Sequence, residues 1–281
     1  FNSSGYWPIP VAATDKASPY VDFFAFEDWS KPFCSWGQPV IDLDSETARE
    51  YVYTAEDSVV QGYLRKPYLA DGWRFDVGNT LYGHRRNEHE ILKDIRQYIK
   101  KANPDALFLS EHGSTDDMFD ETLDSKWNYD FYRPLVEWAK GSITQTELAS
   151  SLFEAVNRLP RPVALSVYNF LSNHDTPGIA CLLGYDFKKV KAAQLLLMTY
   201  LGSPCIYYGD ETGAKGTLNL NSEGFCRHGS NFDSMQWDRR HWNFEITMLY
   251  RSLCELRRAH KALRTGAFEL LTADDSAKVF A

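Results

Sequence analysis

The chain has 281 residues, of which 44% are hydrophobic and 15% aromatic, enough for the core of one large globular domain. Its net charge of −8, without a basic cluster, argues against nucleic acid or an anionic membrane as a partner and suits a neutral substrate. No apolar run approaches the length needed to cross a bilayer. The odd number of cysteines, five, without metal-type spacing, favours reduced thiols and a cytoplasmic location.

The first part of the chain predicts a long loop and then a helix. Residues 1–44 are rich in proline, aromatic and small polar residues and have no sustained period, which is typical of a long excursion after a strand. Ser45 predicts a helix N-terminus. Apolar residues at helical spacing then predict one continuous helix up to the region of Gly62.

Residues 70–79 place an arginine and an aspartate two positions apart in a short apolar run. Because side chains alternate along a strand, Arg74 and Asp76 share one face and three apolar side chains share the other. A neighbouring guanidinium favours the ionised carboxylate, so Asp76 is a candidate nucleophile. The alternative is an ion pair that only holds the strand end in place.

A second helix and a second acid-bearing strand follow. Residues 88–101 repeat apolar side chains on one face, with Asn87 as the predicted N-cap. The apolar run 107–110 then ends in Glu111. A polar loop over 114–121 and a further strand, or its exit, at 127–131 complete this region.

The remaining chain predicts helices, two more strands and a final β segment. A third apolar run, 168–175, ends in His174 and Asp175. Tyr207 and Tyr208 are expected to pack against the barrel wall rather than stack on a sugar, whereas Asp210 and Glu211 are expected on a polar rim loop. The predicted helices are 135–138, 148–159, a nearly buried helix at 186–200, and an amphipathic helix at 244–260, with the opening strands of a β-domain at 268–280.

Three short strands therefore each end in a carboxylate. A parallel barrel gathers the C-terminal ends of its strands on one face, so acids that lie far apart in sequence converge there. Three carboxylates on one rim meet the needs of glycoside cleavage: a nucleophile, a proton donor and a group that supports the cationic transition state.

The same stretches resemble a known enzyme family. Gly72-Trp-Arg-Phe-Asp-Val-Gly-Asn79, Phe108-Leu-Ser-Glu111 and Phe170-Leu-Ser-Asn-His-Asp175 are similar, in order, to three conserved motifs of the α-amylase family of glycoside hydrolases. Pro204 to Glu211 resembles the last barrel strand of that family and the loop after it. Within the family, residues 169–176 and 235–238 resemble the neopullulanase, cyclomaltodextrinase and maltogenic amylase group. The likeness covers nearly the whole chain.

The resemblance implies an α/β fold, a partial TIM (β/α)8 barrel. Residues 1–264 would hold strands four to eight with their helices, and residues 265–281 the start of a C-terminal β-sandwich domain. A motif that precedes the nucleophile strand in this family has no full copy here. We therefore expect a missing N-terminal barrel segment, from the same protein, as a partner.

The resemblance also implies a retaining mechanism and a set of site residues. Asp76 would be the nucleophile, Glu111 the acid and base, and Asp175 the support of the cationic ring. The substrate-binding residues would be Arg74, Asn173, His174, Trp36 and Arg227. The substrate would be an α-glucan such as maltodextrin, cyclodextrin, pullulan or starch, with α-1,4 and also α-1,6 bonds as targets. No cofactor and no metal site are expected, although some relatives use calcium.

Two alternatives to hydrolysis stay open at this point. One is an α-glucan transglycosylase, which passes glucosyl units to another sugar. The other is a catalytically silent relative that binds sugar, favoured by the absent motif and opposed by the intact acids. A homodimer is also considered.

Overall fold

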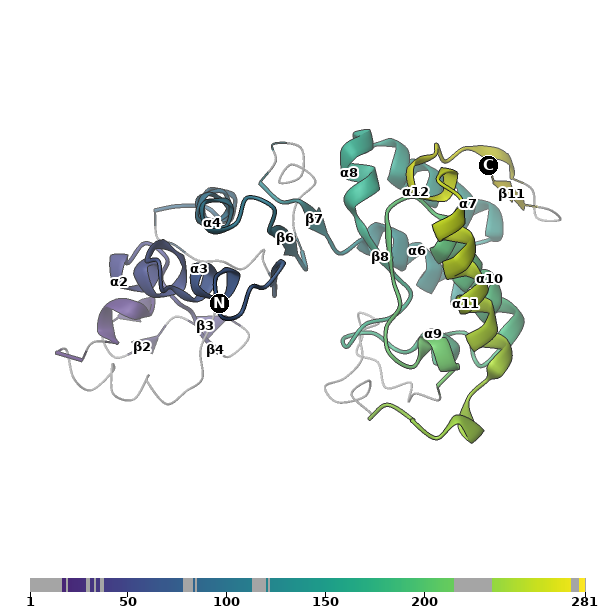
Figure 1. Ribbon diagram of the computed structural model, residues 1–281, viewed down its shortest axis with the longest axis horizontal. Helices are drawn as coiled ribbons and strands as arrows, with labels where there is room; N and C mark the ends of the chain where they lie inside the picture. The colour runs from purple at the N-terminus through teal and green to yellow at the C-terminus, as the bar shows by residue number, and fades with distance from the viewer. Residues whose placement is uncertain are drawn as a thin grey trace. The chain divides into compact units, whose positions relative to one another are not determined.

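A computed structural model describes residues 17–18, 20–28, 31–32, 34–35, 38–77, 83, 85–112, 120, 122–214, 234–273 and 278–280. The chain forms two compact units, unit 1 (Phe1–Trp127) and unit 2 (Asn128–Ala281) (Figure 1). Across the described residues, every helix is too short or too polar to pass through a bilayer.

Unit 1 is built around three parallel strands. Its elements are η1 (Val21–Phe23), β1 (Phe26–Asp28), β2 (Lys31–Pro32), β3 (Cys34–Ser35), β4 (Gln38–Pro39), α2 (Glu46–Arg49), η2 (Glu50–Thr54), α3 (Val59–Leu64), β5 (Gly72–Phe75), α4 (Glu88–Ala102), β6 (Leu107–Ser110) and β7 (Ser125–Lys126). The parallel sheet has the order β5-β6-β7, and β1–β2 and β3–β4 are antiparallel pairs. Gly72 lies opposite Leu107 at the start of the β5–β6 pair.

The helix predicted to run from Ser45 to the Gly62 region is interrupted, so that prediction is wrong in its continuity. Ser45 does cap α2, but the π-helical turn η2 ends at Ala55, which is extended, and Ser58 caps the separate helix α3. The buried side-chain amide of Gln61 donates to three carbonyls of residues 53–55 at 2.9–3.0 Å. These hydrogen bonds satisfy carbonyls that a continuous helix would have used.

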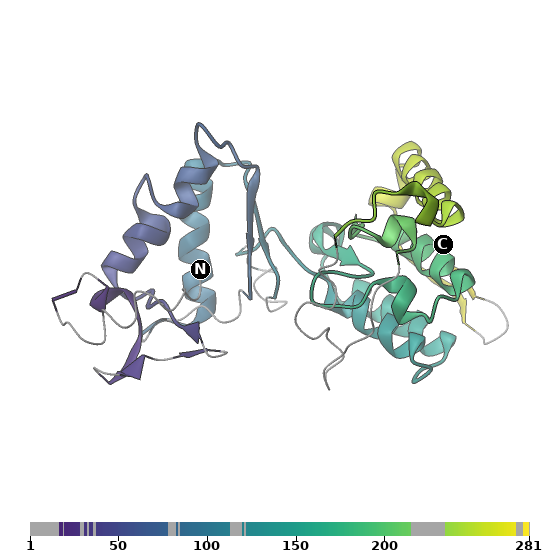
Figure 2. The same cartoon turned by 90° about the horizontal axis from the view of Figure 1, so that it is seen from below.

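Helix α4 confirms the predicted helix and packs against the sheet. Asn87 forms a capping box with Glu90 at its N-terminus. Figure 2 shows α4 running alongside β5 and β6. Fully buried branched side chains on its inner face join one core with side chains of both strands: Ile91, Leu92, Ile95, Ile99, Phe75 and Phe108.

Unit 2 is mainly helical around a pair of parallel strands, β8 and β9. Its elements are α6 (Tyr129–Ala139), α7 (Gln145–Asn157), α8 (Arg161–Ser166), β8 (Tyr168–Phe170), α9 (Ile179–Leu182), α10 (Phe187–Thr199), β9 (Ser203–Cys205), η4 (Asp210–Thr212), η5 (Arg239–His241), α11 (Phe244–Ala259), α12 (Ala262–Thr265), β10 (Leu270–Ala273) and β11 (Lys278–Phe280). Helices α10 and α11 lie side by side (Figure 1). Strands β10 and β11 form an antiparallel hairpin.

For this part of the chain, one expectation is confirmed and another is wrong. The stretch 127–131 is the exit of a strand, the second of the two alternatives: β7 ends at Lys126, and α6 begins at Tyr129, where the Asn128 side chain accepts from the Phe131 N–H at 3.3 Å. Helix α10 is not nearly buried. It buries one face, and Leu195 on the other is 49% exposed.

Candidate active site

The ends of β5 and β6 bring together three charged side chains of the predicted site. Arg74 lies in β5, Asp76 follows that strand directly, and Glu111 follows β6. The strands are held in parallel register, and the Glu111 N–H donates to the Phe75 carbonyl at 2.9 Å. The carboxyl ends of two neighbouring strands therefore deliver one acid each to the same edge.

A single guanidinium bridges the two acids. Nη1 of Arg74 donates to Oδ1 of Asp76, and its Nη2 lies 3.0 Å from Oε2 of Glu111. The Arg74 guanidinium also lies over the Trp127 ring, 4.3 Å from its centroid. The arginine is thereby fixed on three sides, and the two carboxylates are held at a separation set by one planar group.

The two carboxylates differ sharply in exposure. The Asp76 side chain is 58% exposed, whereas that of Glu111 is 5% exposed. Oε2 of Glu111 also accepts from the Val77 N–H at 2.9 Å, and its Oε1 lies 3.9 Å from Nε2 of His112. Val77 has a φ of 41°, a left-handed conformation that is uncommon for a β-branched residue. Oε2 of Glu111 thus accepts one hydrogen bond, from Val77, and forms an ion pair with Arg74.

In unit 2, the loop after β8 presents His174 and Asp175. His174 Nε2 lies 3.2 Å from Asp175 Oδ2, and these side chains are 36% and 40% exposed. Asn173 is buried, and its Oδ1 accepts from the Asp175 N–H at 2.8 Å. Thr176 closes the turn, since its Oγ1 accepts from the Asn173 N–H at 2.7 Å. In this structure Asn173 shapes the loop that presents its two neighbours.

The other predicted site residues are not all placed. Trp36 and Arg227 lie outside the described residues. Asp175 belongs to unit 2, whereas Asp76 and Glu111 belong to unit 1, so their convergence is a proposal. Within the described ranges, no group of three or more His, Cys, Asp or Glu side chains is arranged to hold a metal.

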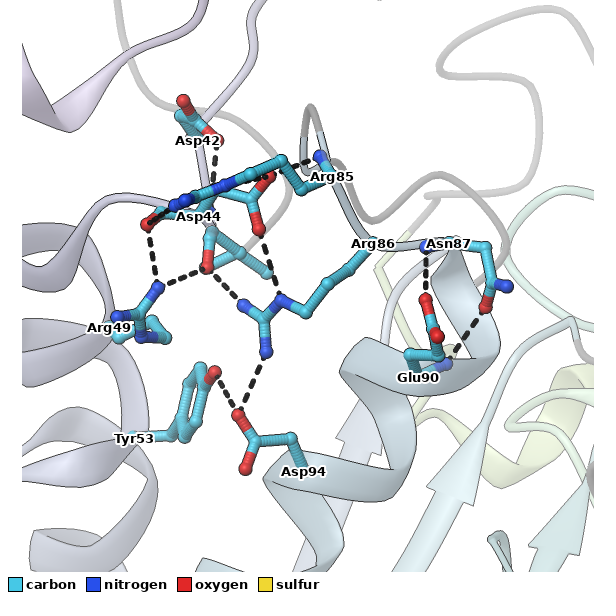
Figure 3. A network of polar contacts seen from close by, with 10 residues as sticks. Asp42, Asp44, Arg49, Tyr53, Arg85, Arg86, Asn87, Glu90 and Asp94 are labelled. Carbon is cyan, nitrogen blue, oxygen red and sulfur yellow. Dashed lines mark hydrogen bonds and ion pairs between the residues drawn. The ribbon is translucent and has the colours of Figure 1, made fainter.

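A polar network holds the segment that returns from the Asp76 loop to α4. Asp44, with its side chain 7% exposed, accepts from the Arg85 N–H and from Arg86 Nε at 3.1 Å. Arg86 continues to Oδ2 of Asp94 on α4 at 3.0 Å, where the Tyr53 hydroxyl also donates at 2.7 Å (Figure 3). Burial opposes ionisation of Asp44, but the hydrogen bonds from Arg85 and Arg86 outweigh it and hold the pKa of Asp44 below its usual value.

Unit 2 also contains a cavity of about 1030 Å³ beside the loop after β9. Its walls combine aromatic rings with side chains that donate hydrogen bonds: Tyr207, Tyr208, Trp242, Phe244, Arg240 and His241. Tyr208 is 44% exposed and contacts the Tyr207 ring at a centroid distance of 4.5 Å. Such walls combine flat apolar faces with hydrogen-bond donors.

Asp210 lies elsewhere than the sequence indicated. It was expected on a polar rim loop, but it is 4% exposed, and burial raises its pKa to about 7. Ser172 Oγ donates to its Oδ2. The carboxyl group contacts Ser172 and Ile179, which lie 38 and 31 positions earlier, so no local pattern reveals its burial.

The sequence of this chain matches the model of a known enzyme family. The family model described as "Alpha amylase, catalytic domain" matches residues 29–243, which include Arg74, Asp76, Glu111, His174 and Asp175. The chain belongs to the α-amylase family. The catalytic domain of this family is a TIM barrel, in keeping with the mixed helices and parallel strands described above.

The similar proteins come from the group that the sequence motifs indicated. A cyclomaltodextrinase from a Bacillus species is 30% identical over 276 residues, covering 97% of this chain and 44% of the relative. Neopullulanase 2 from Thermoactinomyces vulgaris is 29% identical over 285 residues, covering 96% and 45%. The solved structure of the Nostoc punctiforme debranching enzyme superposes with a TM-score of 0.81 at 26% identity, covering 100% of this chain and 62% of that one. The chain thus spans less than half the length of these two curated relatives.

Proposed function

We propose that the protein is a retaining glycoside hydrolase that cleaves α-glucosidic bonds through a covalent glycosyl-enzyme. The observation that carries this proposal is the Arg74 guanidinium that bridges an exposed and a buried carboxylate. Retaining enzymes need two carboxyl groups only about 5–5.5 Å apart, in two different environments. A shared guanidinium supports such a short separation.

Each acid has a surrounding that suits its proposed step. Exposed Asp76 attacks the anomeric carbon, and the bond from that carbon to the leaving oxygen breaks as Glu111 gives that oxygen its proton. Glu111, now ionised, then takes a proton from water, whose oxygen displaces Asp76. The Val77 N–H and Arg74 hold Oε2 of Glu111 in place through both steps.

The second half of the proposed site comes from unit 2. Asp175 binds sugar hydroxyls and supports the positive charge of the ring in the transition state, and His174 donates to a neighbouring hydroxyl. Their mutual contact at 3.2 Å and their partial exposure support roles at a ligand surface.

We infer that the parallel strands β5 to β9 are strands four to eight of the family's barrel. The orders β5-β6-β7 and β8-β9, with α4 and α10 as crossovers, support this assignment. The antiparallel β10–β11 hairpin would then open a C-terminal β-domain, with the boundary near residues 264 and 265. A cytoplasmic location is part of the proposal, supported by the free thiols of Cys181, Cys205 and Cys254.

The proposed substrates are α-glucans with α-1,4 and α-1,6 bonds. The similar proteins are named for acting on cyclomaltodextrin, on pullulan and at branches. The aromatic walls of the unit 2 cavity support sugar binding beside the loop after β9. Incubation of the full-length protein with maltotriose and with pullulan tests the proposal. New reducing ends mean hydrolysis, longer oligosaccharides mean transfer, and binding without turnover would show a silent relative.

The nucleophile assignment has a direct test. Asp76→Asn should lower kcat on maltotriose by about 10⁴-fold or more, because the amide cannot form the glycosyl ester. Acarbose binding, measured by calorimetry, should persist. Asp71→Asn is the matched control, since Asp71 is an exposed acid just before β5, and it should keep full turnover. An Asp76→Asn variant with near wild-type turnover would remove Asp76 from this role.

A further inference from the structure

A buried carboxyl group, that of Asp210, lies against the loop that carries His174 and Asp175. We call this segment, residues 171–178 between β8 and α9, the β8–α9 loop. Asp210 is 4% exposed and begins the short helix η4 after β9. The proposed reaction assigns it no step. Burying a carboxyl group costs free energy unless the group forms hydrogen bonds, so the hydrogen-bond partners of Asp210 indicate its structural role.

Asp210 contacts the β8–α9 loop at both ends. At the start, Ser172 Oγ donates to Asp210 Oδ2. At the far end, the backbone N–H of Ile179, the first residue of α9, donates to the same carboxyl group. His174 and Asp175 lie between these two attachments. Ser172 is buried, and Ile179 is the first residue of a helix. The Asp210 side chain therefore connects the two ends of the loop inside unit 2.

Asp210 is itself held by the scaffold of unit 2. Its N–H donates to the Tyr207 carbonyl at 3.1 Å. The next residues are tied to the start of α11: the Asn243 N–H donates to Thr212 O at 2.9 Å, and Thr247 Oγ1 donates to Glu211 O at 2.8 Å. Asp210 therefore connects the β8–α9 loop to the segment that is hydrogen-bonded to the start of α11.

Asp210 has several titratable neighbours within unit 2. Glu211, Cys205, Tyr207 and Tyr250 are the titratable groups that interact with it electrostatically. The pKa of Tyr207 is raised by burial first, and the charges of both Asp210 and Asp175 add to that rise. Tyr207 thus lies within electrostatic range of the buried carboxyl group and of the exposed one on the loop.

We propose that Asp210 is a positioning residue, which fixes both ends of the β8–α9 loop so that His174 and Asp175 meet the sugar in one geometry. The contribution of the loop to catalysis rests on the proposed function. The attachment of the loop to Asp210 does not depend on that function. Asp210 does not touch the substrate in this scheme and acts only through Ser172 and Ile179.

The test compares Asp210→Ala, Asp210→Asn and Ser172→Ala in the full-length protein. Hydrogen exchange of the β8–α9 loop, read at the Asp175 and Thr176 amides, should speed up by about ten-fold or more in Asp210→Ala, since two hydrogen bonds are lost. Asp210→Asn should restore slow exchange, because an amide can accept from Ile179 and donate to Ser172. Ser172→Ala should lie between, and Glu211→Gln is the matched control with wild-type exchange.

Turnover of maltotriose gives the second readout. Asp210→Ala should lower kcat/KM by about ten-fold to a hundred-fold, and Asp210→Asn should recover most of it. Unchanged loop exchange in Asp210→Ala and Ser172→Ala overturns the anchoring, and faster exchange with unchanged turnover overturns the catalytic part. If Asp210→Ala does not fold, Ser172→Ala and Asp210→Asn decide between these outcomes. A wild-type protein without any glucan turnover refutes the proposed function alone, since the exchange comparison still tests the anchoring.

Discussion

At the scale of single residues, Arg74 has a geometry that another cation would not reproduce. Its two terminal nitrogens serve two carboxylates at once, while its plane lies over Trp127. A lysine ammonium is a compact point charge and would pair with one acid or lie between both without fixing either. The arginine therefore sets the relative position of Asp76 and Glu111 as well as their charge balance.

The first residue-scale prediction concerns this bridge. Arg74→Lys should lower kcat on maltotriose by about 10²-fold, because a misplacement of about 1 Å between reacting groups has that effect. The matched control is Arg158→Lys, which alters an exposed ion pair with Asp130 and should leave kcat unchanged. A near wild-type kcat in Arg74→Lys would show that charge alone suffices.

The second residue-scale prediction concerns Asp210 and pH. Burial raises its pKa to about 7, whereas an unfolded chain has an aspartate pKa of about 3.9. Between these values the native state binds more protons than the unfolded state, so the free energy of unfolding falls as pH rises from about 4 to about 7. Between pH 5 and pH 8, Asp210→Asn should remove about 3 kcal/mol of this decline, since about two pH units of it lie in that range. Urea unfolding at pH 5 and pH 8 measures it, with Glu154→Gln, on the exposed side of α7, as the control. Equal pH slopes for wild type and Asp210→Asn would contradict the buried ionisation.

At the scale of elements, the network around Asp44 fixes the return from the Asp76 loop to α4. Arg86 links Asp44 to Asp94 on α4, and Arg85 contributes mainly its backbone N–H (Figure 3). The Arg85 side chain is 79% exposed and its Nε lies 3.8 Å from Asp44. The two adjacent arginines thus offer a matched pair, one internal and one at the surface.

The corresponding prediction is a difference between these two arginines. Arg86→Met should lower the free energy of unfolding at pH 7 by about 3 kcal/mol, because it leaves a buried carboxylate without its nearest cationic side chain. Arg85→Met should cost less than about 1 kcal/mol, as expected for an exposed pair. Because the pKa of Asp44 is lowered in the fold, the loss in Arg86→Met should shrink as pH falls through that pKa. Equal losses for the two variants would contradict this account.

The sequence predicted elements well where local signals suffice. The caps at Ser45 and Asn87 and the helices α4, α10 and α11 follow from side chains within a few residues of each other. Apolar periodicity did not reveal the break at Ala55, because the hydrogen bonds that stabilise it come from Gln61. It also did not reveal the early start of α6, which depends on the Asn128 cap.

The contacts of the candidate site also divide into those that the sequence predicted and those that only the folded chain reveals. The pairing of Arg74 with Asp76 follows from strand alternation, and the motif resemblance singled out Glu111. The contact from the Val77 N–H to Glu111 joins residues 34 positions apart, and a valine does not signal the left-handed backbone that Val77 adopts. The attachment of Ser172 to Asp210 joins segments separated by two helices and a strand, so only the folded chain reveals it.

At the scale of the whole molecule, each unit has its own hydrophobic core and its own parallel strands. The core of unit 1 lies between α4 and the β5–β6 pair, and that of unit 2 lies among α6, α7, α10 and α11. Each unit also carries one part of the proposed site, with the nucleophile and acid in unit 1 and the loop acid in unit 2. Catalysis in this proposal therefore requires both units in one folded protein.

The prediction at this scale is stereochemical. Full-length protein acting on maltotriose should release sugar that is initially the α-anomer, because two displacements at one carbon restore its configuration. Proton NMR of the anomeric signals in the first minutes, before mutarotation, makes the measurement. Initial release of the β-anomer would indicate a single displacement by water and would refute the covalent intermediate.

The pairing of Gly72 with Leu107 has a consequence for the reacting groups. A methyl group added at Gly72 would lie only 2.2 Å from the Leu107 carbonyl oxygen and 2.6 Å from its nitrogen, so any larger residue would force β5 and β6 apart at their starting ends. Asp76 and Glu111 each follow this pair by the same number of positions along their strands. The width of the gap between these two carboxylates, which the proposed reaction needs, is therefore limited at the opposite end of the sheet, by a hydrogen atom where every other amino acid has carbon.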